Sequence, residues 1–207
     1  MSAISRPPKM VQTARLSSLL LLLMGIGCGG PARVDAPKWN VSQAVKDAFQ
    51  TYDRDTNGKL SADEASPGLR EAFAATDSNK DGALSTEELT ARLDLYVKSQ
   101  VGSQDFSGTV NFSGRPLDGA TVTFVPEKFL GESGKEAQGT TDAQGRFALQ
   151  STGSSLPGAR LGIYLIRVEK KNASGAESVP AKYNSATQLG AEIGTDIRSN
   201  FTLNLTP

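Results

Sequence analysis

The chain has 207 residues, a length that allows one or two domains, and its 22 lysine and arginine residues balance 22 aspartate and glutamate residues. This balance, without a basic patch, argues against nucleic acid as a partner. The sequence contains no histidine, which excludes histidine-dependent catalytic triads and histidine-ligated zinc sites.

Residues 1–27 are predicted to be a signal peptide. The basic residues of this stretch end at Arg15, and an apolar run from Leu16 to Gly27 follows. Twelve residues rise only about 18 Å as a helix, too short for a bilayer core of about 30 Å. The run therefore has the dimensions of a signal peptide rather than of a membrane span, and it is left out of the fold prediction.

A single cysteine, Cys28, lies between two glycines directly after this segment. It cannot form a disulfide within the chain, so lipid attachment is the better use for it in an exported protein, with a free thiol as the alternative. The junction resembles the lipobox of bacterial lipoproteins, although Gly25 stands where that family usually has leucine. The resemblance implies a chain anchored to a membrane through acylated Cys28, in the cell envelope, facing the periplasm or the exterior. Residues 28–37 are predicted to form a lipid-tether linker.

Residues 38–100 have helical periodicity interrupted by two acidic segments. Apolar residues at three- and four-residue steps form one face before the first segment: Val41, Val45, Ala48, Phe49 and Tyr52. Asn40 and Gln43 have the spacing of a capping box. Ser66 followed by Pro67 predicts the start of a second helix, and a third is expected after the second acidic segment.

The two acidic segments, Asp53–Glu64 and Asp77–Glu88, repeat one spacing of oxygen-bearing side chains. Each has Asp first, Asp or Asn third and fifth, Gly sixth and Glu twelfth, which is the calcium-loop pattern. Ca²⁺ takes six to eight oxygens at roughly 2.3–2.6 Å, and alternate positions of such a loop supply them. The predicted ligands of the first site are Asp53, Asp55, Asn57, the carbonyl oxygen of Lys59, Ser61 and Glu64. Those of the second are Asp77, Asn79, Asp81, the carbonyl oxygen of Ala83, Ser85 and Glu88.

One acidic loop of this kind is often only a solvated turn, but two complete copies in tandem favour metal sites. The region resembles an EF-hand pair, which implies Ca²⁺ as the cofactor in two sites. Because Pro67 leaves little room for a helix after Glu64, we expect a compact version of the motif. Leu60 and Leu84, eighth in each loop, are predicted to pair the loops back to back.

The methionines of the chain are Met1, Met10 and Met24, all within the predicted signal peptide. Calcium sensors expose a methionine-rich groove, and the mature chain would lack the material for one. We therefore expect Ca²⁺ to have a structural role.

Residues 104–207 change to short alternating strands separated by glycine-rich turns. Strands are predicted at 106–112, 120–126, 162–169 and 201–205, with others flanking the turn at Asp142 and at Ile193. About seven short strands without a helical period predict a β-sandwich. The predicted fold is thus two domains, α plus all-β: a compact helical pair over 38–100 and a sandwich over 104–207.

Two stretches of this region, Gly114–Phe124 and Gly139–Phe147, resemble carboxypeptidase-regulatory, transthyretin-like (prealbumin-like) domains of bacterial envelope proteins. The resemblance implies a rigid spacer or adhesion module. Its motifs indicate turns and core rather than chemistry, so Asp142 is interpreted as a turn former.

We expect no enzymatic activity, because Asp118, Glu127 and Asp142 do not have the spacing of a glycosidase carboxylate pair in a cleft. The favoured hypothesis is a calcium-binding, lipid-anchored envelope protein whose sandwich is a binding or spacer module for an envelope protein or polysaccharide. The alternative is a dockerin-like, calcium-dependent protein-assembly module. A weaker hypothesis is carbohydrate binding by the sandwich, through Phe129 and Tyr183 in predicted loops.

Overall fold

The computed structural model describes residues 34–36, 38–196 and 200–207. The predicted signal peptide, Cys28 and most of the predicted tether lie outside the described residues. The described residues belong to one compact unit. None of their helices is both long and apolar enough to cross a bilayer.

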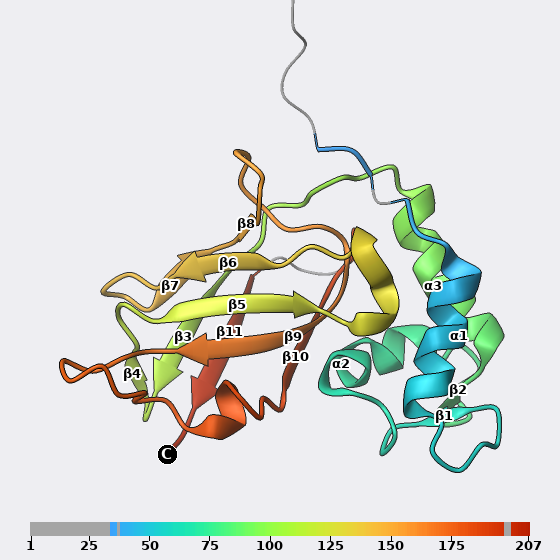
Figure 1. The fold of residues 1–207 in the computed structure, drawn as a ribbon, viewed down its shortest axis with the longest axis horizontal. Helices are drawn as coiled ribbons and strands as arrows, with labels where there is room; N and C mark the ends of the chain where they lie inside the picture. Colours follow the sequence, from blue (N-terminus) through green and yellow to red (C-terminus); the bar gives the residue numbers. More distant parts are fainter. Residues whose placement is uncertain (1–33, 37, 197–199) are drawn as a thin grey trace, which may run out of the picture. The chain divides into compact units, whose positions relative to one another are not determined.

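The helical part contains three helices, each adjoining an acidic loop (Figure 1). They are α1 (Val41–Tyr52), α2 (Pro67–Thr76) and α3 (Thr86–Lys98), and the loops between them carry the short strands β1 (Leu60–Ser61) and β2 (Ala83–Leu84). No helix separates Glu64 from α2 in this part of the chain, as expected from the position of Pro67.

Side-chain caps begin all three helices. Ser66 accepts a hydrogen bond from the Leu69 N–H, as its position before proline predicts. Asn40 accepts one from the Gln43 N–H, but the Gln43 side chain donates to Asp47 instead of returning to the cap. The predicted capping box at Asn40 is therefore only half present.

The two acidic loops pair back to back through β1 and β2, which are antiparallel. Leu60 lies opposite Leu84, and both side chains are fully buried. This pairing, which the eighth-position leucines predicted, is confirmed. It holds the two loops in a fixed relation because each depends on the other for burial of its leucine.

The strand-rich part has a five-stranded sheet of order β10-β9-β5-β6-β8 and a second sheet of order β11-β3-β4, with β7 also paired to β3 (Figure 1). The strands are β3 (Ser107–Phe112), β4 (Arg115–Pro116), β5 (Thr121–Pro126), β6 (Ala137–Thr140), β7 (Arg146–Ala148), β8 (Gln150–Ser151), β9 (Gly162–Glu169), β10 (Leu189–Ile193) and β11 (Asn200–Leu205). This part of the described chain has nine strands, more than the predicted seven or so, because short strands such as β4 and β8 have no alternation of their own.

The two sheets share one aromatic core. Phe124 of β5 has ring contacts with Phe147 of β7 and Phe201 of β11, and Phe106 contacts Phe124 and Phe201 at ring-centroid distances of 5.3 and 5.2 Å. Inward residues alternate with outward ones along β5 and β3, as expected for sheets with one buried face.

The helical part packs against the five-stranded sheet. α2 lies along β10 and β9, and a side chain at Gly190 of β10 would collide with the carbonyl oxygen of Pro67. From α3, Arg92 donates through Nε to Glu192 of β10 at 2.6 Å, and both side chains are buried. The contact between helices and sheet is thus close and partly ionic.

Phe129, predicted to lie free in a loop, is buried. It belongs to the 3₁₀ helix η1 (Lys128–Ser133) and is only 4% exposed. Its ring packs edge-on against Tyr52 of α1, with centroids 6.4 Å apart. Phe129 therefore joins the sheet part to α1 and has no face available for a sugar. Tyr183 lies partly buried in the 3₁₀ helix η2 (Ala181–Tyr183).

Candidate metal centre

The first acidic loop brings its carboxylates together. One oxygen from each of Asp53, Asp55 and Glu64 lies within 4.8 Å of the others. Asp53 is placed at the end of α1, where its N–H donates to the Phe49 carbonyl. Glu64 closes the loop from the far end and is buried. Three oxygens at this separation can share one hard cation.

Glu64 is held in position by hydrogen bonds within the loop. Its Oε1 accepts from the N–H groups of Arg54 and Asp55 at 3.0 and 3.4 Å, and its Oε2 accepts from the Ser61 N–H and hydroxyl at 2.9 and 2.8 Å. The Asp53 carboxylate accepts from the N–H groups of Asn57 and Gly58. The loop therefore curls around its own acidic groups.

The second loop repeats these contacts. Glu88 accepts from the N–H groups of Ser78 and Asn79 through Oε1, at 3.0 and 3.2 Å, and from Ser85 through Oε2. Asp77 accepts from the Gly82 N–H at 3.0 Å, as Asp53 does from Gly58 in the first loop. Because the same hydrogen-bond pattern occurs in both loops, their backbones have the same conformation at these positions.

Ser85 has a second role that its place in the loop did not reveal. Its hydroxyl accepts from the Glu88 N–H and its backbone N–H donates to the Glu88 carboxylate, so the two residues form a complete capping box at the start of α3. The last predicted ligand of the second loop is thus also the third residue of a helix.

Backbone conformation explains the glycines. Gly58 and Gly82 have φ of 80° and 84°, in the left-handed region, while a Cβ at either would meet no atom within 4 Å. They are needed for conformation rather than for space. The fourth residues, Thr56 and Lys80, also have positive φ, of 56° and 60°, which the calcium-loop pattern did not predict.

Hydrogen bonds within the loops favour the charged form of the Glu64 and Glu88 carboxylates. Hydrogen bonds from Ser61, with the backbone N–H first, lower the pKa of Glu64 to about 2. The Ser85 N–H is the chief cause that lowers the pKa of Glu88 to about 2. Both side chains are therefore ionised at neutral pH, the form that binds a cation.

An ion pair crosses between the loops. The Lys59 ammonium lies 2.7 Å from Asp81 Oδ2, and this contact is the chief cause that holds the pKa of Asp81 below its usual value. Asp81 is the predicted fifth-position ligand of the second loop. The two side chains are 50% and 37% exposed, so the pair is a weak one that a divalent cation can displace.

The residues present fit a cation. Asp77 Oδ1 is buried and has no hydrogen-bond partner within the described chain, although an unpaired buried carboxylate oxygen is costly. A divalent cation held by the loop would satisfy it. The donor set of carboxylates, an amide, hydroxyls and carbonyls is the one that Ca²⁺ takes.

The twelve predicted ligand residues therefore lie in two adjacent loops of matching geometry, with the tightest group of carboxylates in the first. Sequence reasoning missed Ser78, whose hydroxyl donates to Glu88 at 3.1 Å. It also missed the pairing of Lys59 with Asp81. The calcium-loop pattern specifies no side chain at position 78 or 59, so it could not predict the contacts of the Ser78 hydroxyl and the Lys59 ammonium group.

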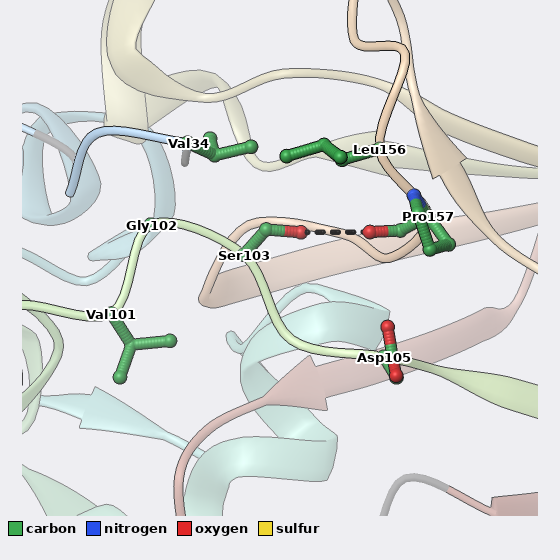
Figure 2. Close-up of a pocket in the computed structure, with 7 residues that line it drawn as sticks. All are labelled: Val34, Val101, Gly102, Ser103, Asp105, Leu156 and Pro157. Carbon is green, nitrogen blue, oxygen red and sulfur yellow. Dashed lines mark hydrogen bonds between the residues drawn. The ribbon is translucent and has the colours of Figure 1, made fainter. Parts of the chain in front are cut away.

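A further hollow of the described chain lies between the segment before α1 and the turn at Pro157 (Figure 2). Figure 2 shows the Ser103 hydroxyl donating to the Pro157 carbonyl, at 3.4 Å. Asp105 is the one carboxylate among its lining residues. This arrangement does not gather the groups that a metal or a reaction would need.

Comparison with known proteins supports the interpretation of the two acidic segments as calcium loops. Residues 45–64 and 69–93 match the EF-hand family model, and these stretches include both acidic loops. The predicted EF-hand character of the helical part is confirmed, and with it the assignment of calcium binding. No curated protein matches the chain.

Among solved structures, the chain is similar to the crystal structure of a 9R-lipoxygenase from Cyanothece PCC8801, with a TM-score of 0.28 and 15% identity. The similarity covers 51% of this chain and 16% of that one. It carries no argument about fold or function.

Proposed function

We propose that this protein is an exported, lipid-anchored protein of the cell envelope in which two Ca²⁺ ions have a structural role. The observation that carries the calcium part of the proposal is the duplicated loop geometry, with Glu64 and Glu88 held alike and Asp77 Oδ1 without a hydrogen-bond partner among the described residues. When bound, Ca²⁺ supplies positive charge that offsets the repulsion among the carboxylates gathered in each loop.

A structural role for the ions is supported by the way the helices contact the sheet. α2 packs on β10 and β9, and α3 carries the buried Arg92–Glu192 ion pair. Helices so constrained have little freedom for the opening by which calcium sensors expose a groove. The absence of methionine after residue 24 points the same way.

The proposed anchor is acylated Cys28, and its support is the basic and apolar pattern of residues 1–27 with one cysteine after it. Mass spectrometry of the mature N-terminus is the test. A chain that starts at Cys28 and carries the added mass of acyl groups is expected. An unmodified cysteine or a different start would contradict the anchor.

For the strand-rich part we propose the role of a transthyretin-like binding or spacer module, without enzymatic activity. Support comes from the two resembling stretches and from the shared core of two sheets. Its partner would be an envelope protein or polysaccharide. Retention of the protein on isolated envelope polysaccharide, compared with retention on envelope proteins, distinguishes the two.

The dockerin-like alternative has less support, because α2 is already packed on the sheet. A pull-down from envelope extract, with and without calcium chelator, separates the two hypotheses. Capture of a protein partner that is lost on chelation, and lost equally in calcium-site variants, would favour the alternative.

Calcium titration calorimetry tests the metal sites directly. The full chain should bind two Ca²⁺ ions, and Glu64→Gln and Glu88→Gln should each remove or strongly weaken one site, since the bidentate twelfth carboxylate is lost. Glu87→Gln is the matched control, because Glu87 is exposed beside Glu88 and is no predicted ligand. Unchanged stoichiometry in both loop variants would overturn the assignment.

A further inference from the structure

A cleft of about 530 Å³ lies where the first calcium loop and α2 meet the five-stranded sheet. Its floor includes Val125 of β5 and Leu165 of β9, which are opposite each other in the sheet. Its walls include the end of α1, the segment from Asp63 to Pro67, and the first residue of η1. The lining thus combines apolar residues of the sheet with polar residues of the helical part and η1.

Four cationic side chains line this cleft: Arg54, Arg70, Lys128 and Arg167. All four are exposed. Arg167 is two residues from Leu165 along β9, so both side chains point from the same face of the sheet. The four come from the first loop, α2, η1 and β9, and only the tertiary fold brings them together.

None of these cations has an acidic partner among the described residues. Arg54 and Arg70 each donate to a backbone carbonyl, of Asp63 at 2.7 Å and of Ala65 at 3.1 Å. A guanidinium has five N–H donors, so most of the donors of these side chains are left for a ligand.

Three acidic residues line the cleft, and two of them already accept hydrogen bonds from neighbouring groups. Glu127 is buried, accepting from the Ser66 hydroxyl at 2.5 Å and from the Tyr52 hydroxyl at 2.8 Å. Both oxygens of Glu64 accept from their own loop. The acid whose carboxylate is left exposed in the lining is Asp63. These neutral donors leave the carboxylate charge in place, so the lining has four cationic groups and three carboxylates, a net charge of +1.

We propose that this cleft is a binding site for an oxyanion, the phosphate, sulfate or carboxylate group of a small ligand. Planar guanidinium groups match such oxygens two at a time. The apolar floor at Val125 and Leu165 would contact the uncharged part of the ligand. A site of this kind would let the protein bind an anionic ligand in addition to Ca²⁺.

Binding in the cleft is linked to calcium, a step that rests on the proposed function. Glu64 is both the closing ligand of the first loop and part of the cleft wall. An ion in the loop adds two positive charges beside the cleft and offsets the charge of Glu64, which favours an anion. By linkage, the anion then raises the calcium affinity of the first loop by the same factor.

The test is a titration of the full chain with sodium sulfate, followed by NMR of backbone and arginine N–H groups, at constant ionic strength maintained with sodium chloride. We expect saturable shifts at Arg70 and Arg167 with calcium present. Arg70→Gln and Arg167→Gln should each weaken sulfate binding about tenfold, the usual effect of losing a charge-assisted hydrogen bond. Arg115→Gln, on exposed β4 outside the cleft, is the matched control and should bind as the parent chain does.

Equal sulfate affinity in the parent chain and both cleft variants, or shifts no larger than those from chloride, would overturn the site. Equal affinity with calcium present and absent would overturn the link. Calcium binding is measured separately, so a chain that binds no calcium refutes the proposed function while its sulfate titration still decides the cleft. Comparing sulfate with acetate at matched ionic strength then identifies the preferred oxyanion.

Discussion

At the residue scale, the two loops share one pattern but differ in their carboxylates. Each has three carboxylates at its predicted ligand positions, with asparagine at the fifth position of the first loop (Asn57) and at the third position of the second (Asn79). The second also has Asp81 paired with a lysine from its neighbour. Since this lysine competes with the ion for one of the three charged ligands of the second loop, we expect the first loop to bind more tightly.

Replacing Lys59 by glutamine should increase the calcium affinity of the second loop by about two- to fivefold. The substitution removes the ammonium group that competes for Asp81, and an exposed ion pair of this kind is a weak competitor. Lys59 is predicted to contribute only its backbone carbonyl to the first site, so that site should keep its predicted ligands. Calcium titration calorimetry measures both sites.

Lys46→Gln is the control for this charge change, because Lys46 is exposed on α1 and outside both loops. It should leave both affinities close to those of the parent chain. A Lys59→Gln chain with unchanged or weaker binding at the second loop would mean that the pairing with Asp81 does not compete with the ion.

At the element scale, helix ends and strand positions follow from neighbouring residues. Ser66 with Pro67 predicted the start of α2 at the residue where it begins. The expected strand at 162–169 coincides with β9. The parallel pairing of β11 with β3 was not predicted, because pairing between distant strands depends on the whole sheet rather than on either strand.

Replacing Gly190 by alanine should destabilise the protein by about 1–3 kcal/mol, the usual cost of overpacking. A methyl group at this place in β10 would collide with the carbonyl oxygen of Pro67 and lie 2.7 Å from the Gly68 nitrogen. Both are backbone atoms at the start of α2, so neither can rotate away. Urea unfolding of both chains measures the difference.

Gln188→Ala, just before β10 and exposed, is the matched control and should change stability by less than about 0.5 kcal/mol. If Gly190→Ala is as stable as the control, the start of α2 yields easily, and the contact between α2 and β10 contributes little to stability.

At the scale of the whole molecule, α3 and β10 are joined by one buried ionic cluster. Arg92 donates to buried Glu192 and, through its other nitrogens, to half-exposed Asp196. Tyr96 also donates to Glu192. Burial raises the pKa of Glu192 above its ordinary value of 4.5, while Arg92 opposes that rise. Arg92, together with the hydrogen bond from Tyr96, therefore favours the charged form of this carboxylate inside the protein.

Arg92→Met should destabilise the protein by about 3–5 kcal/mol at pH 8, because it leaves a buried charge without its partner. The loss should shrink as the pH falls. A carboxyl whose folded pKa is raised contributes its full stability below the unfolded pKa, near 4.5, and loses it as the pH rises through the folded pKa. Urea unfolding at pH 5 and pH 8 measures both values.

The double variant Arg92→Met with Glu192→Gln should recover part of the lost stability and have much less pH dependence, because no titrating group is left at the centre of the cluster. An Arg92→Met chain that is equally destabilised at both pH values would mean that Glu192 is not the source of the loss.

Removal of calcium should destabilise the helical and strand-rich parts together. Each site filled at 100 times its dissociation constant stabilises the native state by about 2.7 kcal/mol, and the described residues form one compact unit. We expect one thermal transition, seen equally by helix and strand signals in circular dichroism, whose midpoint falls on chelation. A strand signal that melts separately and ignores calcium would contradict this coupling.

The sequence by itself determined the two EF-hand loops, the N-cap of α2, the pairing of Leu60 with Leu84 and most strands after residue 104. Each depends on spacing within a few residues or on alternation along one strand, so contiguous sequence carries the information. The tertiary structure alone decided that Arg92 meets Glu192, that Phe129 is buried against Tyr52, and that four cations without an acidic partner in the described part of the chain share one cleft. These contacts join residues far apart in the chain, and their partners are decided by how α1, α2 and α3 pack on the strand-rich part.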